Sequence, residues 1–254
     1  MIVISLQSGS NGNCLYVEGG GTGVLVDAGI SGLAAQRRLE RFGVDIRRAA
    51  GVVISHDHRD HARCAGVYQR KFGLPVYMTP RTFRAARRWM DLGEMNNVRP
   101  FQAGQTLDFG PLRMETVPTP HDGTDGAAFV AVEGRKRVGV LTDLGHVFGG
   151  LADLVAGLDA VVLESNYDPD MLASGPYPEF LQTRIRGPGG HLSNEEAAGL
   201  LAAGAGRLAW ACLAHLSEEN NAPDVALATH RAVLGRRLPL FVASRYEPVG
   251  VLTI

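Results

Sequence analysis

A short apolar stretch at residues 52–54 runs without a break into a cluster of histidines and aspartates. The cluster reads Ser55-His56-Asp57-His58-Arg59-Asp60-His61. Alternate side chains of an extended backbone project to one side, so residues 56, 58 and 60 converge where a buried strand ends. Three imidazoles and a carboxylate this close together form a ligand set suited to Zn²⁺, Mn²⁺ or Fe²⁺. The alternative is a polar loop with accidental histidines, but three of the eight histidines in the chain fall within residues 56–61.

Strand and helix patterns alternate along the rest of the chain. Strands are predicted at residues 2–6, 14–18, 23–27, 51–55, 75–78, 106–109, 112–117, 127–132, 137–142, 160–164, 208–214 and 240–242. Helices are predicted at residues 32–42, 61–72, 79–90, 194–203 and 222–234, and a long loop with one or two helical turns at 166–190. A β-rich half followed by a mixed half indicates two packed sheets with helices outside, an α/β (α+β) architecture. A doubly wound α/β fold would give similar runs.

Composition narrows the class of protein. The 254 residues are 45% hydrophobic and 20% charged, with a net charge of −1, so the chain can bury a sizeable core and general disorder is excluded. No apolar run approaches the ~18 residues of a membrane span. The first residues lack the basic segment of a signal peptide. Cys14, Cys64 and Cys212 lie far apart and outside any C-x-x-C pair, and we expect reduced thiols in a cytoplasmic protein.

Basic residues concentrate in the first third of the chain, where residues 31–90 hold 13 basic and four acidic side chains. This surplus is interpreted either as a solvated helical face or as a surface for an anionic ligand such as phosphate. Arg81, Arg84 and Arg88 share one face of the predicted helix at 79–90 and are candidate substrate-binding residues, with Arg87 at the flank. Trp89 either anchors this helix or stacks on a base, and the sequence favours anchoring.

The histidine cluster is an H-x-H-x-D-H signature, and in it the chain resembles the metallo-β-lactamase fold superfamily. Further markers of that family appear in the expected order at successive strand ends: Asp27, His121, Asp143 and His215. Each alone would more often be a loop histidine or a turn aspartate. Together they imply a four-layer αββα sandwich, formed by one domain over residues 1–254 without an inserted β-CASP domain.

The resemblance also implies a dinuclear metal centre with two divalent transition-metal ions, zinc, manganese or iron. The first ion would be held by His56, His58 and His121, and the second by Asp60, His61 and His215. Asp143 would bridge the two ions, and Asp27 would support the metal-binding loop from behind. We also count Asp60 among the candidate catalytic residues.

A further histidine precedes a predicted helix in Gly190-His191-Leu192-Ser193-Asn194-Glu195-Glu196. Ser193 and Glu196 form an S-x-x-E capping box, which places His191 beside a helix N-terminus, where a phosphate oxygen is favoured. With His215 it resembles the phosphodiesterase branch of the family, including tRNase Z-like enzymes, in which such a histidine assists the leaving group. His191 is therefore a candidate catalytic residue, and the alternative is that it only lines the loop.

Residues 8–14, 187–196 and 215–221 narrow the resemblance to the WalJ (YycJ) group, whose members are regarded as DNA-directed 5′→3′ exonucleases. Tyr167 stands where that group is expected to carry a histidine. The resemblance implies a cytoplasmic metal-dependent phosphodiesterase or exonuclease with DNA as its partner, and no membrane or obligate protein partner. Two alternatives remain. One is a hydrolase of small phosphodiesters or thioesters, and the other is a non-catalytic scaffold that binds nucleic acid.

Several other residues are weaker candidates. His146 could face substrate, although a loop histidine is the favoured interpretation, and His230 is predicted to lie on the surface. Cys64 is interpreted as a buried structural thiol rather than a site residue.

Overall fold

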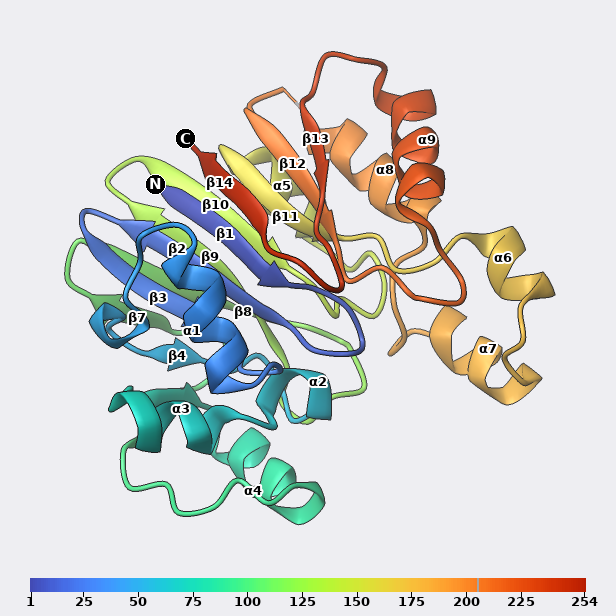
Figure 1. Ribbon diagram of the computed structural model, residues 1–254. Coiled ribbons are helices and arrows are strands. Elements are labelled where there is room, and N and C mark those ends of the chain that lie inside the picture. The colour runs from blue at the N-terminus through green and yellow to red at the C-terminus, as the bar shows by residue number, and fades with distance from the viewer. Residues whose placement is uncertain (205) are drawn as a thin grey trace.

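Two mixed β-sheets form the centre of the computed structural model, which describes residues 1–204 and 206–254 (Figure 1). The first sheet contains β1 (Ile2–Gln7), β2 (Cys14–Gly19), β3 (Thr22–Val26), β4 (Val52–Val53), β5 (Val76–Met78), β6 (Val98–Pro100) and β14 (Val249–Thr253). The second contains β7 (Thr106–Phe109), β8 (Leu112–Pro118), β9 (Ala127–Glu133), β10 (Lys136–Leu141), β11 (Ala160–Glu164), β12 (Trp210–Ala214) and β13 (Leu240–Val242).

Helices follow the strands of both sheets, and most of them cover the outer faces. Those that follow strands of the first sheet are α1 (Gly32–Glu40), the 3-10 helix η1 (Ile46–Arg48), α2 (Arg59–Ala62), α3 (Ala65–Phe72) and α4 (Pro80–Trp89). Those that follow strands of the second are α5 (Leu151–Ala156), α6 (Pro169–Ser174), α7 (Glu179–Arg186), α8 (Asn194–Gly204) and α9 (Pro223–Leu234). In the described part of the chain, no helix combines the length and apolar character needed to cross a membrane.

Three apolar layers hold these elements together. Side chains of both sheets, including Val53, Phe129 and Val162, pack in a central layer. A second layer lies between the first sheet and α1, α3 and α4, and a third between the second sheet and α5, α8 and α9. The predicted four-layer αββα arrangement is therefore confirmed, and the doubly wound alternative is wrong because the strands form two sheets rather than one.

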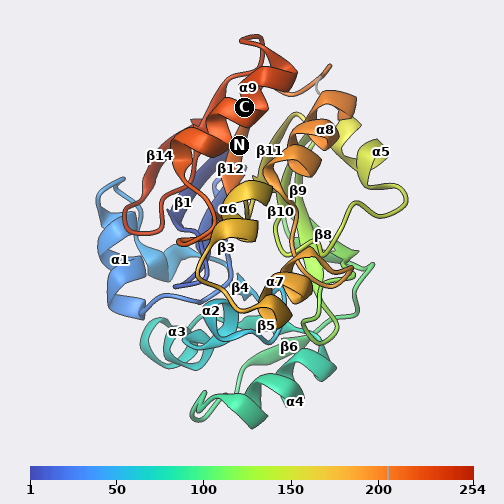
Figure 2. The ribbon, with the colours of Figure 1, turned by 90° about the vertical axis from the view of Figure 1, so that its right-hand side faces the viewer.

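The direction of the strands decides where polar loops collect. In the first sheet β3, β4, β5 and β6 run parallel, and in the second β10, β11, β12 and β13 run parallel. Parallel neighbours end at the same edge, so the loops after them meet there. Figure 2 shows this edge of the molecule, with α6 and α7 in front of the strand ends and α4 below.

The structure differs from the sequence prediction in several segments. The predicted helix at 61–72 is divided at Cys64 into α2 and α3. The region predicted as a long loop contains α6 and α7, which pack on a small core of their own around Leu172 and Ile185. Strands β6 and β14 and helix α5 were not predicted. β14 pairs with β1 from the opposite end of the chain, and a local pattern carries no signal for such pairing.

Candidate metal centre

Polar side chains that follow the ends of several strands lie close together at the edge of the two sheets. Asp27 follows β3, Asp143 follows β10 after one residue, and His215 follows β12. All three adopt left-handed backbone, with φ values of 65°, 56° and 56°. Such a backbone costs a non-glycine residue on the order of 1–3 kcal/mol and persists only where the surroundings enforce it. The turn after each strand therefore directs a site residue inward.

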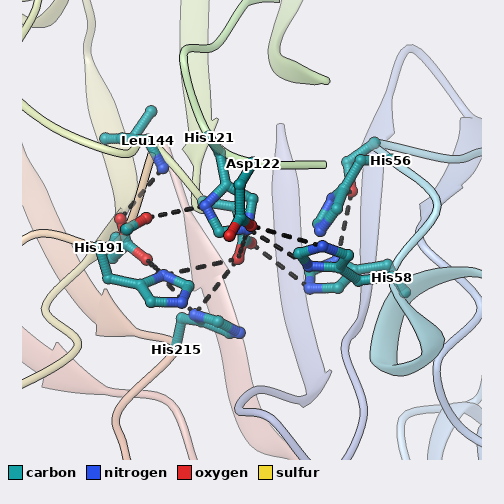
Figure 3. Close-up of polar contacts among 12 residues, drawn as sticks. His56, His58, His121, Asp122, Leu144, His191 and His215 are labelled. Atoms are coloured by element: carbon teal, nitrogen blue, oxygen red, sulfur yellow. Dashed lines mark hydrogen bonds and ion pairs between the residues drawn. The ribbon is translucent and has the colours of Figure 1, made fainter. Parts of the chain in front are cut away.

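One group of side chains consists of His56, His58 and His121, whose ligand atoms lie within 4.8 Å of one another (Figure 3). The Nδ1 atom of His121 donates a hydrogen bond to the Gly190 carbonyl oxygen at 2.8 Å. The Nε2 atom of His121 lies 3.3 Å from Nδ1 of His58. The hydrogen bond to Gly190 fixes the tautomer, so His121 presents an unprotonated Nε2 to the group.

A second group consists of Asp60, His61 and His215. The Oδ2 atom of Asp60 lies 3.3 Å from His61 Nε2 and 3.5 Å from His215 Nε2. Asp27 lies behind the group, with Oδ2 2.7 Å from His61 Nδ1 and Oδ1 2.8 Å from the Ser55 backbone nitrogen. The hydrogen bond from His61 Nδ1 to Asp27 leaves the lone pair on Nε2, which faces the group and accepts from the Asn13 side-chain amide at 2.9 Å.

Asp143 lies between the two groups. Its Oδ1 atom is 3.7 Å from His121 Nε2, and its Oδ2 atom is 3.4 Å from His61 Nε2. Oδ1 is also 3.5 Å from Nδ1 of His215. A carboxylate in this position reaches both groups at once.

Two buried polar atoms show that the cluster fits metal ions. His56 Nε2 and Asp143 Oδ2 are buried and have no hydrogen-bond partner among the described residues. Buried polar atoms without a partner are costly and rare in folded proteins. Both belong to a set of nitrogen and oxygen atoms that would suit zinc, manganese or iron, and a bound cation would satisfy them. The buried His/Asp groups are thus consistent with a dinuclear metal site.

Electrostatics support the same interpretation. Burial lowers the pKa of His56 and His58, so these imidazoles are neutral, as metal ligands must be. At His215 burial also acts to lower the pKa, but the carboxylates of Asp143 and Asp60 outweigh it and raise the pKa to about 10. Burial acts to raise the pKa of Asp60, yet His61 and His215 hold it well below its ordinary value. This end of the centre carries excess negative charge, which a divalent cation would balance.

His191 reaches the centre together with Glu164, a carboxylate that our sequence analysis missed. Glu164 is fully buried, and its Oε1 atom lies 2.7 Å from Nδ1 of His191. Its Oε2 atom accepts hydrogen bonds from the backbone nitrogens of Leu144 and Leu192 at 3.1 and 3.3 Å. Burial acts to raise the pKa of Glu164, but His191 and His215 outweigh it and the pKa is lowered, so an anion faces His191.

This arrangement gives His191 two possible roles. Its Nδ1 atom is held by Glu164, which leaves Nε2 free for substrate. The ligand atoms of Asp143, Glu164, His191 and His215 also lie within 4.8 Å of one another, so His191 could instead be a ligand. The predicted capping box is present: Ser193 Oγ accepts from the Glu196 nitrogen at 3.1 Å, and Glu196 Oε2 accepts from the Ser193 nitrogen at 2.8 Å.

The remaining candidates lie outside the cluster. His146 donates from Nδ1 to the Pro188 carbonyl oxygen at 2.7 Å, as a loop histidine would. Tyr167 is buried, which raises its pKa to about 12, and its carbonyl oxygen accepts from the Asn194 nitrogen at 2.8 Å. Cys64 is only half-buried, between α2 and α3.

Two predictions about exposure were wrong. His230 is fully buried, and its Nδ1 atom donates to the Ala226 carbonyl oxygen at 2.9 Å. Trp89 is 77% exposed and therefore does not anchor α4. In both cases the packing of the helix on its sheet decides which side chain is covered, and this packing is not visible in the sequence around the residue.

The arginines of α4 lie beside the centre without entering it. Arg81, Arg84 and Arg88 are exposed. The first turn of α4 contacts the loop that carries His121, because Thr82 Oγ1 donates to the Thr124 carbonyl oxygen at 2.8 Å. Of the three arginines, Arg81 reaches this loop, with Nη1 3.9 Å from Asp125 Oδ1. In the described residues no contact joins the three arginines to the buried cluster.

Close packing behind the second group leads to a testable expectation for Gly29. A Cβ atom on Gly29 would lie 1.6 Å from the Asp60 carbonyl oxygen and 2.5 Å from the Asn13 nitrogen. We expect Gly29→Ala to displace Asp60 and His61, to reduce the metal content and to lower the free energy of unfolding by about 1–3 kcal/mol. Elemental analysis and urea denaturation would measure both effects. Gly199→Ala is the matched control, because a Cβ atom there meets nothing within 4 Å; a metal loss equal in both variants would contradict the expectation.

Fold and centre together define a metal-dependent hydrolase of the metallo-β-lactamase class. The chain belongs to the metallo-β-lactamase superfamily, since residues 22–215 match the family described as the Beta-lactamase superfamily domain.

Two exodeoxyribonucleases are similar in sequence to most of the chain. The chain is 33% identical to exodeoxyribonuclease YycJ of Bacillus anthracis over 230 residues, and this alignment covers 90% of the chain and 87% of YycJ. It is 34% identical to exodeoxyribonuclease WalJ of Streptococcus pneumoniae serotype 2, strain D39, over 227 residues, which cover 88% of the chain and 84% of WalJ. Among solved structures, the metallo-β-lactamase fold protein YhfI from Bacillus subtilis superposes with a TM-score of 0.73 at 16% identity, covering 98% of this chain and 100% of YhfI. The last likeness shows the fold alone.

Proposed function

We propose that the protein is a metal-dependent phosphodiesterase that removes nucleotides from DNA ends in the 5′→3′ direction. The similarity to two exodeoxyribonucleases over about 90% of the chain supports DNA as the substrate. The observation that carries the proposal is the pair formed by His191 and Glu164 at the edge of the buried cluster, 2.7 Å apart. A histidine held in this way suits the protonation of a leaving alkoxide. We further propose that the chain acts as one domain in the cytoplasm.

In this proposal His56, His58 and His121 would hold one ion and Asp60, His61 and His215 would hold the other, and Asp143 would serve both. Zinc or manganese, or alternatively iron, suits these ligands. When bound, two such ions stabilise negative charge on the attacking and leaving oxygens of a phosphodiester.

The protein's own groups supply the remaining chemistry. Asp27 orients His61 through the hydrogen bond to its Nδ1 atom. Asp60 keeps its charge because its pKa is low, and as a catalytic residue it offsets the positive charge of the centre. His191 would donate a proton from Nε2 to the leaving oxygen, while Glu164 fixes the ring and stabilises its charged form.

The test is incubation of metal-reconstituted protein with end-labelled single-stranded and double-stranded DNA and RNA, with bis-p-nitrophenyl phosphate in parallel. Stepwise loss of mononucleotides from the 5′ end of DNA is the expected result. Hydrolysis of the small diester without cleavage of any nucleic acid would favour a small-molecule hydrolase on the same fold. No hydrolysis of either substrate by protein that contains two metal ions would contradict an enzymatic role.

The arginine face of α4 is expected to contribute to DNA binding through the phosphate backbone. Each phosphate contact releases counterions, so replacing Arg84 and Arg88 by alanine should weaken binding and flatten its salt dependence by about one unit per lost contact. Fluorescence anisotropy with labelled DNA at several salt concentrations measures this slope. An unchanged slope together with unchanged cleavage would show that this face is only solvated.

A further inference from the structure

Two exposed aromatic side chains stand out on the surface. Among the described residues the most exposed large apolar side chains are Trp89 at 77% and Phe180 at 76%. The next, Tyr246, is 58% exposed. Single exposed apolar residues are common on protein surfaces, so exposure alone assigns no role. What distinguishes this pair is the position of the two helices that carry it.

Both helices, α4 and α7, form side-chain hydrogen bonds with the loop at residues 119–126, which carries His121. On α4 the contact is made by Thr82, which donates to the Thr124 carbonyl oxygen at 2.8 Å, and Trp89 follows about two turns later. On α7 the contact is made by Arg184, whose Nε and Nη2 atoms donate to Asp122 at 2.6 and 3.0 Å. Phe180 precedes Arg184 by four residues, so both lie on the same face of α7.

The segment that carries Phe180 is firmly attached to the centre. The His191 nitrogen donates to the Ile185 carbonyl oxygen at 3.0 Å, and His121 donates to Gly190 just beyond α7. Ile185 packs in turn against Leu172 in the small core of this region. An aromatic side chain on a rigid helix loses little conformational freedom when a ligand stacks on it. The helix that carries Phe180 is therefore attached to the loops of the centre, and the exposed ring is on a fixed backbone.

Arginines accompany both aromatics. Arg87 and Arg88 directly precede Trp89. On α7, Arg184 is paired with Asp122, so Arg186 is the arginine of this helix that we expect to meet a phosphate. Aromatic side chains with arginines around them are the typical composition of surfaces that bind single-stranded nucleic acid, in which arginines track phosphates and rings stack on bases. Stacking of this kind requires a base that is not already paired within a duplex.

We propose that Trp89 and Phe180 stack on bases of a single-stranded DNA end and hold it across the metal centre. This inference rests on the proposed function and deepens it, because it names an unpaired strand as the form of DNA that the site receives. α7 lies in front of the strand ends and α4 below them (Figure 2), and each of these helices is hydrogen-bonded to the loop that carries His121.

Tryptophan fluorescence tests the first contact directly. The chain has two tryptophans, and the other, Trp210, is 5% exposed with Nε1 bonded to the Thr253 carbonyl oxygen. Titration of the metal-loaded protein with a phosphorothioate oligothymidylate should quench the emission of Trp89. Trp89→Phe should remove the quenching and keep most of the binding. Binding by anisotropy without any quenching in the unmodified protein would overturn the role of Trp89.

Kinetics test the second contact. Phe180→Ala should raise KM for a single-stranded oligonucleotide by about 5- to 100-fold, the range for loss of one stacked base, with a small change in kcat. Phe180→Tyr should restore KM, and an abasic oligonucleotide should reduce the difference between Phe180→Ala and the unmodified protein. Val233→Ala is the control, since Val233 is 52% exposed at the far end of α9.

The outcomes separate the two proposals. An unchanged KM in Phe180→Ala, in a protein that cleaves DNA, would overturn the stacking role and leave the proposed function intact. Failure of the unmodified protein to cleave DNA, with hydrolysis of bis-p-nitrophenyl phosphate retained, would overturn the proposed function itself.

Discussion

Replacement of Asp143 by asparagine or alanine is expected to lower kcat on a phosphodiester by about 10³-fold or more and to reduce the metal content below two ions per chain. Asp143 contacts both ligand groups, with distances of 3.4 to 3.7 Å to His61, His121 and His215. Loss of its charge therefore weakens both positions, and stabilisation worth several kcal/mol corresponds to this factor. Elemental analysis and steady-state kinetics measure the two effects. His215→Ala should mainly weaken the second position.

The backbone at Asp143 calls for a matched control. Its φ of 56° is unfavourable for alanine, so Asp143→Ala also carries a cost unrelated to metal binding. Asp125 has nearly the same backbone, with a φ of 57°, and does not belong to either ligand group. Asp125→Ala should therefore show the backbone cost with full metal content. Two bound ions in Asp143→Asn, or a consistent stoichiometry of one or none in the unmodified protein, would contradict the dinuclear assignment.

His191→Ala should keep both metal ions and lose roughly 10²–10⁴-fold in kcat on DNA, the usual range for loss of a general acid. The loss should shrink with bis-p-nitrophenyl phosphate, because p-nitrophenolate leaves without needing a proton. Comparison of kcat on the two substrates, together with the metal content, measures the role of His191. Glu164→Gln should change kcat in the same direction, since the carboxamide keeps the shape of Glu164 but cannot stabilise a charged imidazole.

His146→Ala provides the control for this experiment. His146 lies on a neighbouring loop and contacts the Pro188 carbonyl oxygen rather than the cluster, so its loss should leave both substrates nearly unaffected. Loss of one metal ion from His191→Ala would identify His191 as a ligand, in the group that it forms with Asp143, Glu164 and His215. An equal loss of kcat on both substrates with full metal content would indicate a structural role.

Most residues of the buried cluster can be recognised in the sequence because they follow a local rule. His56, Asp143 and His215 each come just after an apolar strand, and residues in that position lie at the edge of a sheet whatever the rest of the chain does. Residues 193–196 likewise contain their whole capping signal within one turn, and the predicted box is present. Short-range patterns of this kind survive folding unchanged because both partners are close in the sequence.

The features that the sequence did not predict depend on packing between segments that are distant in the chain. Glu164 is the last residue of β11, and nothing in the neighbouring sequence distinguishes it from a glutamate on the surface. It becomes part of the centre because His191, 27 residues later in the chain, contacts it. The pairing of β14 with β1 and the burial of His230 depend equally on segments that are distant in the sequence.

The sequence by itself thus determined the types of candidate ligand and the strand ends that carry them. Only the tertiary structure decided which side-chain atoms of the cluster lie within reach of one another. Their positions depend on the left-handed backbone at Asp27, Asp143 and His215 and on the packing of the two sheets face to face. A turn of that kind is unfavourable for an isolated chain, and the contacts that enforce it exist only in the folded protein.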